Sequence, residues 1–188
     1  MLASAILVSA LLADTKAEIA EAKSVEKAAA AVAETAGKTS NMFMSDSDTG
    51  KKWSKMATAE SHLDKEGMWN CDSTAFVYTS KGKVVYVAVM QSSPSGDWGQ
   101  GINYSYRADG TLAVISAGYS AFSPVEGSLV REWFYNKKGK LVGSTLVAKN
   151  SDQKPLGAKD KAEMTKYAPV APKWLKVSQL PFLKLVQK

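Results

Sequence analysis

The sequence predicts an α+β fold, in which an antiparallel meander sheet of about six strands is built from three successive hairpins. One or two N-terminal helices are expected to pack on or beside this sheet. Between residues 71 and 150, a short pattern occurs three times, beginning at Tyr78, Tyr106 and Tyr135. Each copy reads Tyr, three polar or small residues, Gly, Lys or Thr, and then Val or Leu. The flanking segments are rich in the β-branched and aromatic residues that suit half-buried strands.

The glycine of each copy predicts a hairpin turn. Gly82, Gly110 and Gly139 occupy the same place in the pattern, and glycine adopts the positive φ that closes such a turn without steric cost. A three-residue loop would pair Tyr78 with Val84, Tyr106 with Leu112, and Tyr135 with Leu141. Side chains alternate between faces along a strand. One face should therefore be aromatic and collect Phe76, Tyr78, Tyr86, Ile102, Tyr104, Tyr106, Val114, Leu129, Trp133, Tyr135 and Val147.

The seven-residue pattern resembles the hairpin signatures of the YD and MORN-type repeat families. Those families repeat on shorter periods than the 28 and 29 residues that separate the tyrosines here. No function is therefore inferred from the resemblance.

The first thirteen residues are expected to be a signal peptide. Residues 2–13 form an uncharged run of twelve, which matches the apolar core of a secretory signal and is too short to span a bilayer. No Lys or Arg precedes the run, and the small-x-small sequence Ala20-Glu21-Ala22 lies beyond several charges. An intracellular N-terminal helix is the alternative to export.

Residues 14–46 should form an Ala-rich helix, ending near Gly37, and then a polar loop. The helix has a thin apolar stripe and is expected to be peripheral or poorly ordered. Residues 47–150 are interpreted as the main domain, comprising a second helix over residues 50–67 and the sheet. Asp46 to Gly50 superficially matches the start of a calcium loop, but Gly50 and Ala57 offer no side-chain oxygen at later ligand positions.

Residues 151–188 are predicted to be a Lys-rich tail whose apolar end docks on the domain. Residues 1–148 hold 15 Lys+Arg and 15 Asp+Glu, whereas residues 149–188 hold nine Lys and three acids, which accounts for the whole net charge of +6. Because only Arg107 and Arg131 are arginine, specific nucleic-acid recognition is not expected. Residues 174–186 are too hydrophobic to remain exposed.

Groups that support catalysis are scarce. The chain has one His and one Cys, which excludes a Cys/His zinc cluster and a disulfide framework. No phosphate loop, nucleophile elbow or cofactor motif is present, so no catalytic residue, metal or cofactor is expected. A hydrolase using Asp97, His62 or Glu132 is the least favoured hypothesis.

The sequence therefore favours an exported, secreted or periplasmic, non-catalytic binding module. Its partner would be a protein, a glycan or a small apolar ligand, because Tyr and Trp bind through apolar area and one polar tip. The candidate ligand residues are Tyr104, Tyr106, Trp133 and Tyr135, with Trp98 in the loop of residues 91–101 as a lid. Two alternatives stay open. In one, the aromatic face is covered core; in the other, the protein serves in envelope structure or assembly.

Overall fold

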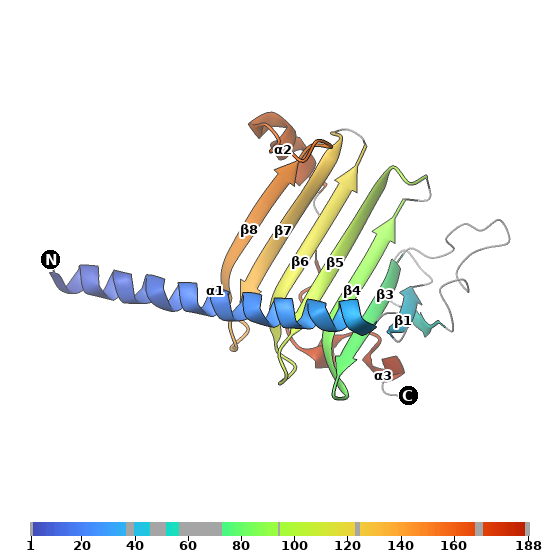
Figure 1. Cartoon of the computed structure of the whole chain (residues 1–188), viewed down its shortest axis with the longest axis horizontal. Helices are drawn as coiled ribbons and strands as arrows, with labels where there is room; N and C mark the ends of the chain where they lie inside the picture. The colour runs from blue at the N-terminus through green and yellow to red at the C-terminus, as the bar shows by residue number, and fades with distance from the viewer. Residues whose placement is uncertain are drawn as a thin grey trace.

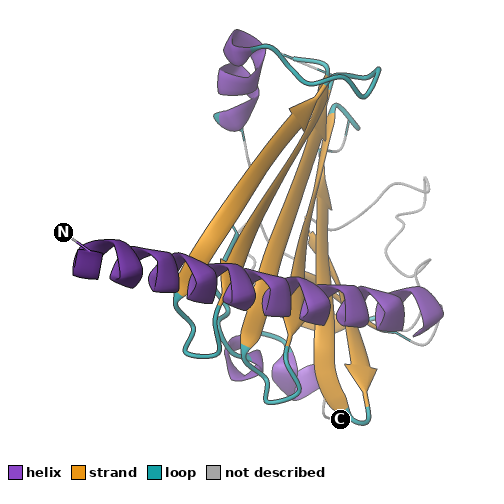
Figure 2. Ribbon diagram, turned by 60° about the vertical axis from the view of Figure 1, so that its left-hand side comes forward, coloured by secondary structure: helices purple, strands orange, loops and turns teal. Residues whose placement is uncertain are grey.

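A computed structural model of the chain shows one antiparallel sheet with helical elements on both faces. It describes residues 2–36, 40–45, 52–56, 73–93, 95–122, 125–167 and 171–186, and within these ranges it describes the side chains of all but residues 2–13 and 44–45. The eight strands lie in the order β2-β1-β3-β4-β5-β6-β7-β8. The long helix α1, Leu2–Ala36, crosses one face of the sheet, while the C-terminal segment lies on the other (Figures 1 and 2).

Six of the strands form the predicted meander. They are β3 Ser73–Ser80, β4 Lys83–Ser92, β5 Trp98–Tyr106, β6 Leu112–Ala121, β7 Gly127–Tyr135 and β8 Leu141–Lys149. Every neighbouring pair is antiparallel. The α+β class and the meander are therefore confirmed.

The three pattern glycines lie in hairpin turns, as predicted. Gly82, Gly110 and Gly139 have φ of 75°, 82° and 76°, values that suit glycine because side chains with a Cβ rarely adopt them. The pairs Tyr106–Leu112 and Tyr135–Leu141 are observed.

The first hairpin differs from the expected register. Ser80 pairs with Lys83, so the loop has only two residues, Lys81 and Gly82, both with positive φ. Tyr78 consequently pairs with Tyr86, and Val84 pairs with Thr79. Positive φ at both loop residues matches the type I′ turn, which fits the twist of the flanking strands.

The expected aromatic face is divided between the two sides of the sheet. Tyr104 pairs with Val87 and Ile115, and Ile115 pairs with Trp133; cross-strand partners share a face. Register shifts beside Tyr78, Tyr106 and Tyr135 change the alternation near the turns. The tyrosine face, which carries Tyr104, Tyr106, Trp133 and Tyr135, is therefore opposite the helix face, which carries Phe76, Tyr78, Tyr86, Val114 and Val147.

Two short strands precede the meander where the sequence favoured other structure. β1, Asn41–Ser45, lies within the segment that was expected to be a polar loop, and it pairs with β3. β2, Trp53–Lys55, pairs with β1 where a helix over residues 50–67 was expected, so that prediction is wrong at these residues. Ring packing explains the difference, because the centroid of Trp53 lies 4.9 Å from that of Phe182. Most of the remaining predicted helix, with His62, lies outside the described residues, as do Cys71 and the calcium-like segment of residues 46–50.

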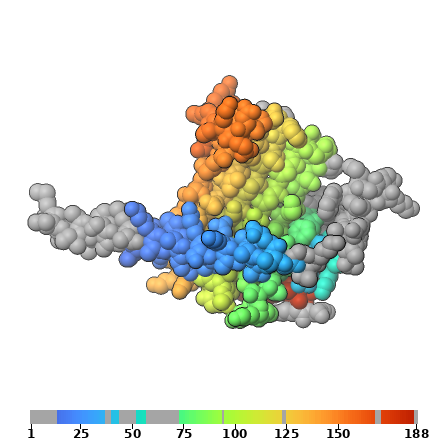
Figure 3. Space-filling model, in the orientation of Figure 1, coloured from blue at the N-terminus to red at the C-terminus, as the bar shows by residue number. Residues whose placement is uncertain are grey.

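Helix α1 is packed across the sheet rather than peripheral. Its small side chains allow a close approach: Ala22 and Ala29 are buried, and Ile19 and Val25 pack against Phe134 and its neighbours. A Cβ at Gly143 would lie 2.8 Å from Cδ1 of Ile19. The thin apolar stripe is therefore enough to pack the helix on the sheet, because Gly143 in the strand beneath leaves room for Ile19. Figure 3 shows α1 running across the lower ends of the strands, while much of this face above the helix is uncovered.

The C-terminal segment covers the tyrosine face. Leu112 N donates to Leu175 O at 2.9 Å, and Val177 N donates to Gly110 O at 2.9 Å. The segment continues through a short 3-10 helix η3, Val177–Gln179, and α3, Leu183–Val186. Leu180 and Phe182 are buried in the main core.

A second helix, α2, Ala158–Thr165, covers the other end of the same face. Its Met164 is buried against Tyr119 and Leu129. Within the described part of the chain, no helix is long and apolar enough to cross a membrane.

Candidate functional site

The predicted ligand residues of the tyrosine face lie beneath the C-terminal segment. Tyr104, Tyr106 and Tyr135 are buried. The ring centroids of Tyr104 and Trp174 are 4.8 Å apart, and the hydroxyl of Tyr106 donates to the Trp174 carbonyl at 3.2 Å. Burial raises the pKa of both Tyr104 and Tyr106. In this conformation a peptide segment of the chain itself occupies the expected platform.

The other two predicted residues are placed differently. Trp133 is half-buried, and the Arg131 guanidinium lies 4.9 Å from its ring centroid. Trp98 begins β5 at the opposite end of the sheet from Tyr106; it is 36% exposed and stacks on Tyr119 at 6.4 Å. Four of the five predicted residues therefore share the tyrosine face near one end of the sheet, and Trp98 lies at the other end.

Of the three residues weighed for hydrolysis, the structure describes Asp97 and Glu132, and each bonds to a different neighbour. Asp97 lies in the β4–β5 connection and accepts a hydrogen bond from Ser95, whereas Glu132 on β7 accepts one from Thr145 at 2.7 Å. Among the residues that the structure describes, no three His, Cys, Asp or Glu side chains are grouped to hold a metal ion.

A cavity of about 520 Å³ lies between α1 and the hairpin turns. Small or apolar side chains of α1 and β4 form much of its wall; they are Val25, Ala28, Ala29, Val32 and Val85. Glu21, Arg107, Asp109 and Lys137 supply the charged part of the lining, and Tyr106 also contributes. This is the size and character of a small-molecule site. Of the predicted ligand residues, only Tyr106 lines it.

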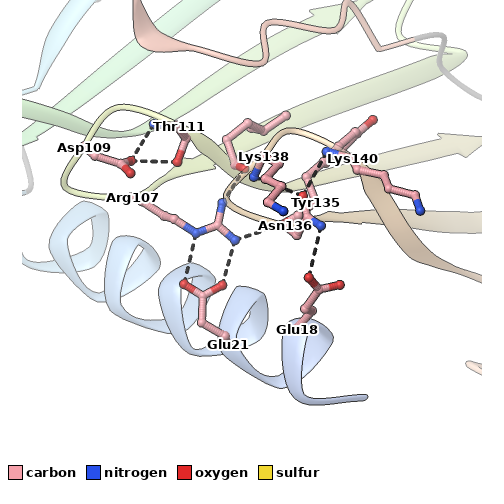
Figure 4. A network of polar contacts seen from close by, with 10 residues as sticks. Glu18, Glu21, Arg107, Asp109, Thr111, Tyr135, Asn136, Lys138 and Lys140 are labelled. Carbon is pink, nitrogen blue, oxygen red and sulfur yellow. Dashed lines mark hydrogen bonds and ion pairs between the residues drawn. The ribbon is translucent and has the colours of Figure 1, made fainter. Parts of the chain in front are cut away.

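A bidentate ion pair fixes α1 at this cavity (Figure 4). Arg107 Nε and Nη2 donate to the two carboxylate oxygens of Glu21 at 3.0 and 2.7 Å. The same guanidinium donates to the carbonyls of Leu112, at 2.6 Å, and Tyr135, at 2.7 Å. Because Arg107 is only 5% exposed, its nearly complete set of partners marks it as a clamp between the helix and two hairpins.

The turns beside the clamp are fixed by their own polar groups. Asp109 accepts hydrogen bonds from the hydroxyl and the backbone amide of Thr111. Both bonds, the one from the hydroxyl most of all, hold the pKa of Asp109 below its usual range. Asn136 donates to Glu18 at 3.0 Å while its Oδ1 accepts from the amides of Lys138 and Lys140. Side-chain hydrogen bonds therefore close both the β5–β6 and the β7–β8 turns, and each turn contacts α1 (Figure 4).

Sequence reasoning missed the Arg107–Glu21 clamp, although the repeated pattern contained a signal for it. The residue after the tyrosine is Thr79, Arg107 or Asn136 in the three copies. In the second and third copies, that side chain bonds to a glutamate of α1. An arginine next to a core tyrosine needs a buried partner, and the Ala-rich helix supplied candidate carboxylates.

Comparisons of the chain with protein-family models, with curated proteins and with solved structures found no match.

Proposed function

We propose that this protein is a non-catalytic binding module whose ligand is a small, largely apolar molecule with a polar or anionic end. The observation that carries the proposal is the cavity between α1 and the hairpin turns. It combines a mostly apolar wall with a charged part of the lining. Such a combination is typical of pockets in which apolar area supplies affinity and a few polar groups set orientation.

The side chains of α1 account for the room in the cavity. Ala28 and Ala29 carry only a methyl group where a larger residue would occupy the space. Ala29 is buried and lets the helix approach the sheet closely, whereas Ala28 is exposed and lines the cavity, so alanines of α1 contribute to both docking and the pocket. Apolar area removed from water contributes roughly 25 cal/mol per Å², so a modest apolar ligand gains useful affinity here.

The charged part of the lining is balanced, with Lys137 and Asp109 beside the Arg107–Glu21 pair, so Lys137 orients an anionic group of a ligand without a net positive charge to attract it. Glu21 and Arg107 satisfy one another, which leaves the exposed ammonium of Lys137 as the cation that lines the cavity without belonging to that pair. The hydrogen bond from Arg107 holds the pKa of Glu21 below its usual range. Both carboxylates of the lining thus stay ionised between pH about 5 and about 8, and affinity should vary little across that window.

Export to the periplasm or the exterior remains part of the proposal. It rests on the uncharged run of residues 2–13. The contacts of α1 described above begin at Glu18 and include Ile19 and Glu21. Removal of about thirteen residues would therefore leave the clamp and the cavity intact.

The test is a fluorescence titration with anilinonaphthalene sulfonate, an apolar anion whose emission rises when it leaves water. Ala28→Trp should fill the cavity and weaken binding at least about tenfold, or about 1.4 kcal/mol. The matched control is Ala31→Trp on the same helix, because Ala31 is exposed like Ala28 but does not line the cavity.

A charge-reversal pair tests the anionic end. Lys137→Glu should weaken binding of the probe, whereas Lys138→Glu, one residue further along the turn and outside the lining, should change it little. Circular dichroism checks that each variant is folded, since partly unfolded chains also bind this dye. Equal affinities of the wild type and Ala28→Trp would overturn the proposal.

A further inference from the structure

We infer that the hairpin-turn end of the sheet is a docking surface for an anionic lipid bilayer. This end comprises the β3–β4, β5–β6 and β7–β8 turns and the part of the C-terminal segment beside them, residues 173–184 (Figures 1 and 2). The inference goes beyond the function proposed above and does not depend on it, because only one lysine of this end, Lys137, lines the cavity beneath α1.

The lysines of this end are exposed and outnumber its acids. The β3–β4 and β7–β8 turns carry five lysines, and the adjoining C-terminal segment carries three more. The eight residues are Lys81, Lys83, Lys137, Lys138, Lys140, Lys173, Lys176 and Lys184. None of them forms an ion pair with another described residue. The three turns and the segment contain one acid, Asp109, so the end has a strongly positive potential.

The rest of the described structure does not share this excess of positive charge. Residues 14–36 of α1 hold five acids and three lysines, which reduces the charge near the turns without cancelling it. At the opposite end of the sheet, residues 149–167 hold five lysines and three acids, and Asp97 and Glu126 add two further acids. Two of those five lysines are paired, with Asp152 at 3.6 Å and with Glu163 at 2.6 Å. The molecule is therefore polarised along its strands.

Lysines on closed turns suit a fluid anionic surface. The backbone of the β7–β8 turn is held by Asn136, whose Oδ1 accepts from the amides of Lys138 and Lys140 at 3.1 and 3.0 Å. The side chains beyond that backbone are flexible point charges, which need no fixed geometry in the anion that they meet. Each lysine near an anionic bilayer raises binding roughly fivefold.

The arginines do not favour a nucleic acid as the partner of this end. Nucleic-acid surfaces commonly use arginine for bidentate contacts and aromatic rings for stacking. Arg107 is buried in its bonds to Glu21 and to two carbonyls, and Arg131 lies over the ring of Trp133. Neither guanidinium is therefore available for a phosphate at the turns.

A cavity of about 540 Å³ among these lysines favours a lipid more directly. Its apolar lining is formed by Val84, Val177, Leu183 and Val186. Lys83 also lines it, and its Nζ donates to the carbonyl of Ala108 at 3.1 Å, which holds the ammonium group at the cavity. An apolar recess beside an ammonium group suits the upper acyl chain and the phosphate of a phospholipid. The polar backbone of a nucleic acid would gain nothing from such a recess.

The experiment is vesicle co-sedimentation of the full chain. Vesicles of phosphatidylcholine alone are compared with vesicles that contain about one-third phosphatidylglycerol. The uncharged run of residues 2–13 can attach to either bilayer, so the ratio of the two partition coefficients isolates the effect of charge. At an ionic strength of about 0.1 M the anionic vesicles should bind at least about 20-fold more tightly, and most of this difference should vanish at about 1 M.

Two variants with the same net charge locate the docking surface. The turn-end variant neutralises three exposed lysines that do not line the cavity beneath α1, with Lys81→Gln, Lys138→Gln and Lys140→Gln. The control neutralises three exposed lysines of the opposite end, with Lys154→Gln, Lys159→Gln and Lys166→Gln. The turn-end variant should bind anionic vesicles at least about tenfold more weakly than the wild type, whereas the control should stay within about twofold. Circular dichroism checks that both variants are folded.

Three results would overturn the inference. The first is equal binding of the wild type to neutral and anionic vesicles, and the second is an equal loss of binding in the two variants. The third is tighter binding of a thymidylate oligonucleotide than of anionic vesicles at the same concentration of negative charge, which would indicate a nucleic-acid partner. Ala28→Trp should leave vesicle binding unchanged even where it abolishes dye binding, so a failure of docking is distinguishable from a failure of the proposed ligand cavity.

Discussion

Replacing Glu21 with Gln should destabilise the whole domain, because Glu21 is the charge partner of an almost fully buried arginine. Arg107 holds α1 to the β5–β6 hairpin and to β7 through four hydrogen bonds, two of them to Glu21. Gln has the same shape, but it removes the negative charge and can accept through only one oxygen. The variant therefore presents an amide N–H₂ to a guanidinium donor.

The size of the effect follows from the burial of the two groups. Hydrogen bonds to charged groups contribute roughly 1.5–3 kcal/mol, and breaking a fully buried pair costs about 3–5 kcal/mol. The Arg107 side chain is 5% exposed but that of Glu21 is 38% exposed, so water replaces part of the lost interaction. A loss of about 2 kcal/mol is expected at neutral pH, which lowers the Tm of a chain of this size by about 4–8 °C.

The pH dependence gives a sharper test. The bond from Arg107 lowers the pKa of Glu21 in the folded protein, so the stabilisation is present above the unfolded-state pKa of about 4.3. It is lost as pH falls through the lower, folded-state pKa. The difference in unfolding free energy between wild type and Glu21→Gln should therefore be widest near pH 7 and narrow below pH about 4.

Urea unfolding, followed by tryptophan fluorescence at several pH values, measures this difference. Glu18→Gln is the matched control: Glu18 lies three residues earlier on α1 and accepts a hydrogen bond from Asn136, which the glutamine carbonyl can still accept. An unchanged midpoint for Glu21→Gln at pH 7 would refute the reasoning. So would a difference that persists undiminished in acid.

Three further predictions concern the core, the turns and the N-terminus. Tyr104→Phe should be neutral or stabilising by up to about 1 kcal/mol, because the Tyr104 hydroxyl is buried and has no partner among the described residues. Tyr106→Phe should cost about 1 kcal/mol, because it loses the bond to Trp174; similar urea midpoints for the two variants would contradict both. Gly139→Val should cost about 1 kcal/mol or more through its positive φ, and an unshifted midpoint would count against that turn. Intact mass spectrometry of protein from its own host should show a chain that lacks about the first thirteen residues and still contains Glu18; an intact N-terminus in the soluble cytosolic fraction would refute export.

The meander could be predicted because its signals are local. Each hairpin needs a glycine with positive φ and two strand-forming segments, and both are visible in a single stretch of sequence. Gly82, Gly110 and Gly139 were therefore placed correctly. The faces could not be assigned in the same way, because one register shift at Tyr78 or Tyr106 changes the side on which a whole set of residues lies.

The N-terminal strands were missed because their stability comes from distant partners. Residues 53–55 carry no strong strand signal, and their strand depends on pairing with β1 and on packing between Trp53 and Phe182. These residues are more than 120 positions apart in the chain, roughly two-thirds of its length. Long-range packing of this kind overrides local propensity.

The cavity lies elsewhere than at most of the residues that the sequence favoured, and binding through apolar area stays a prediction. The supply of Tyr and Trp indicated binding through apolar area, yet Tyr104 and Tyr135 are core residues, and the cavity is lined instead by alanines of α1 that attracted no attention. An alanine contributes to a pocket by leaving empty the space that a larger side chain would fill. That contribution becomes visible only when the opposite wall is known.

The two arginines show how burial decides between structural and recognition roles. Arg107 is enclosed by Glu21 and two carbonyls, and Arg131 lies over the ring of Trp133. Both are engaged within the domain, so the exposed positive charge at the helix side of the molecule rests with lysines such as Lys137. A lysine is a compact, flexible cation that attracts an anionic group without fixing its geometry. The cavity beneath α1 should therefore discriminate among ligands mainly by the shape of their apolar part, with the anionic end contributing orientation more than specificity.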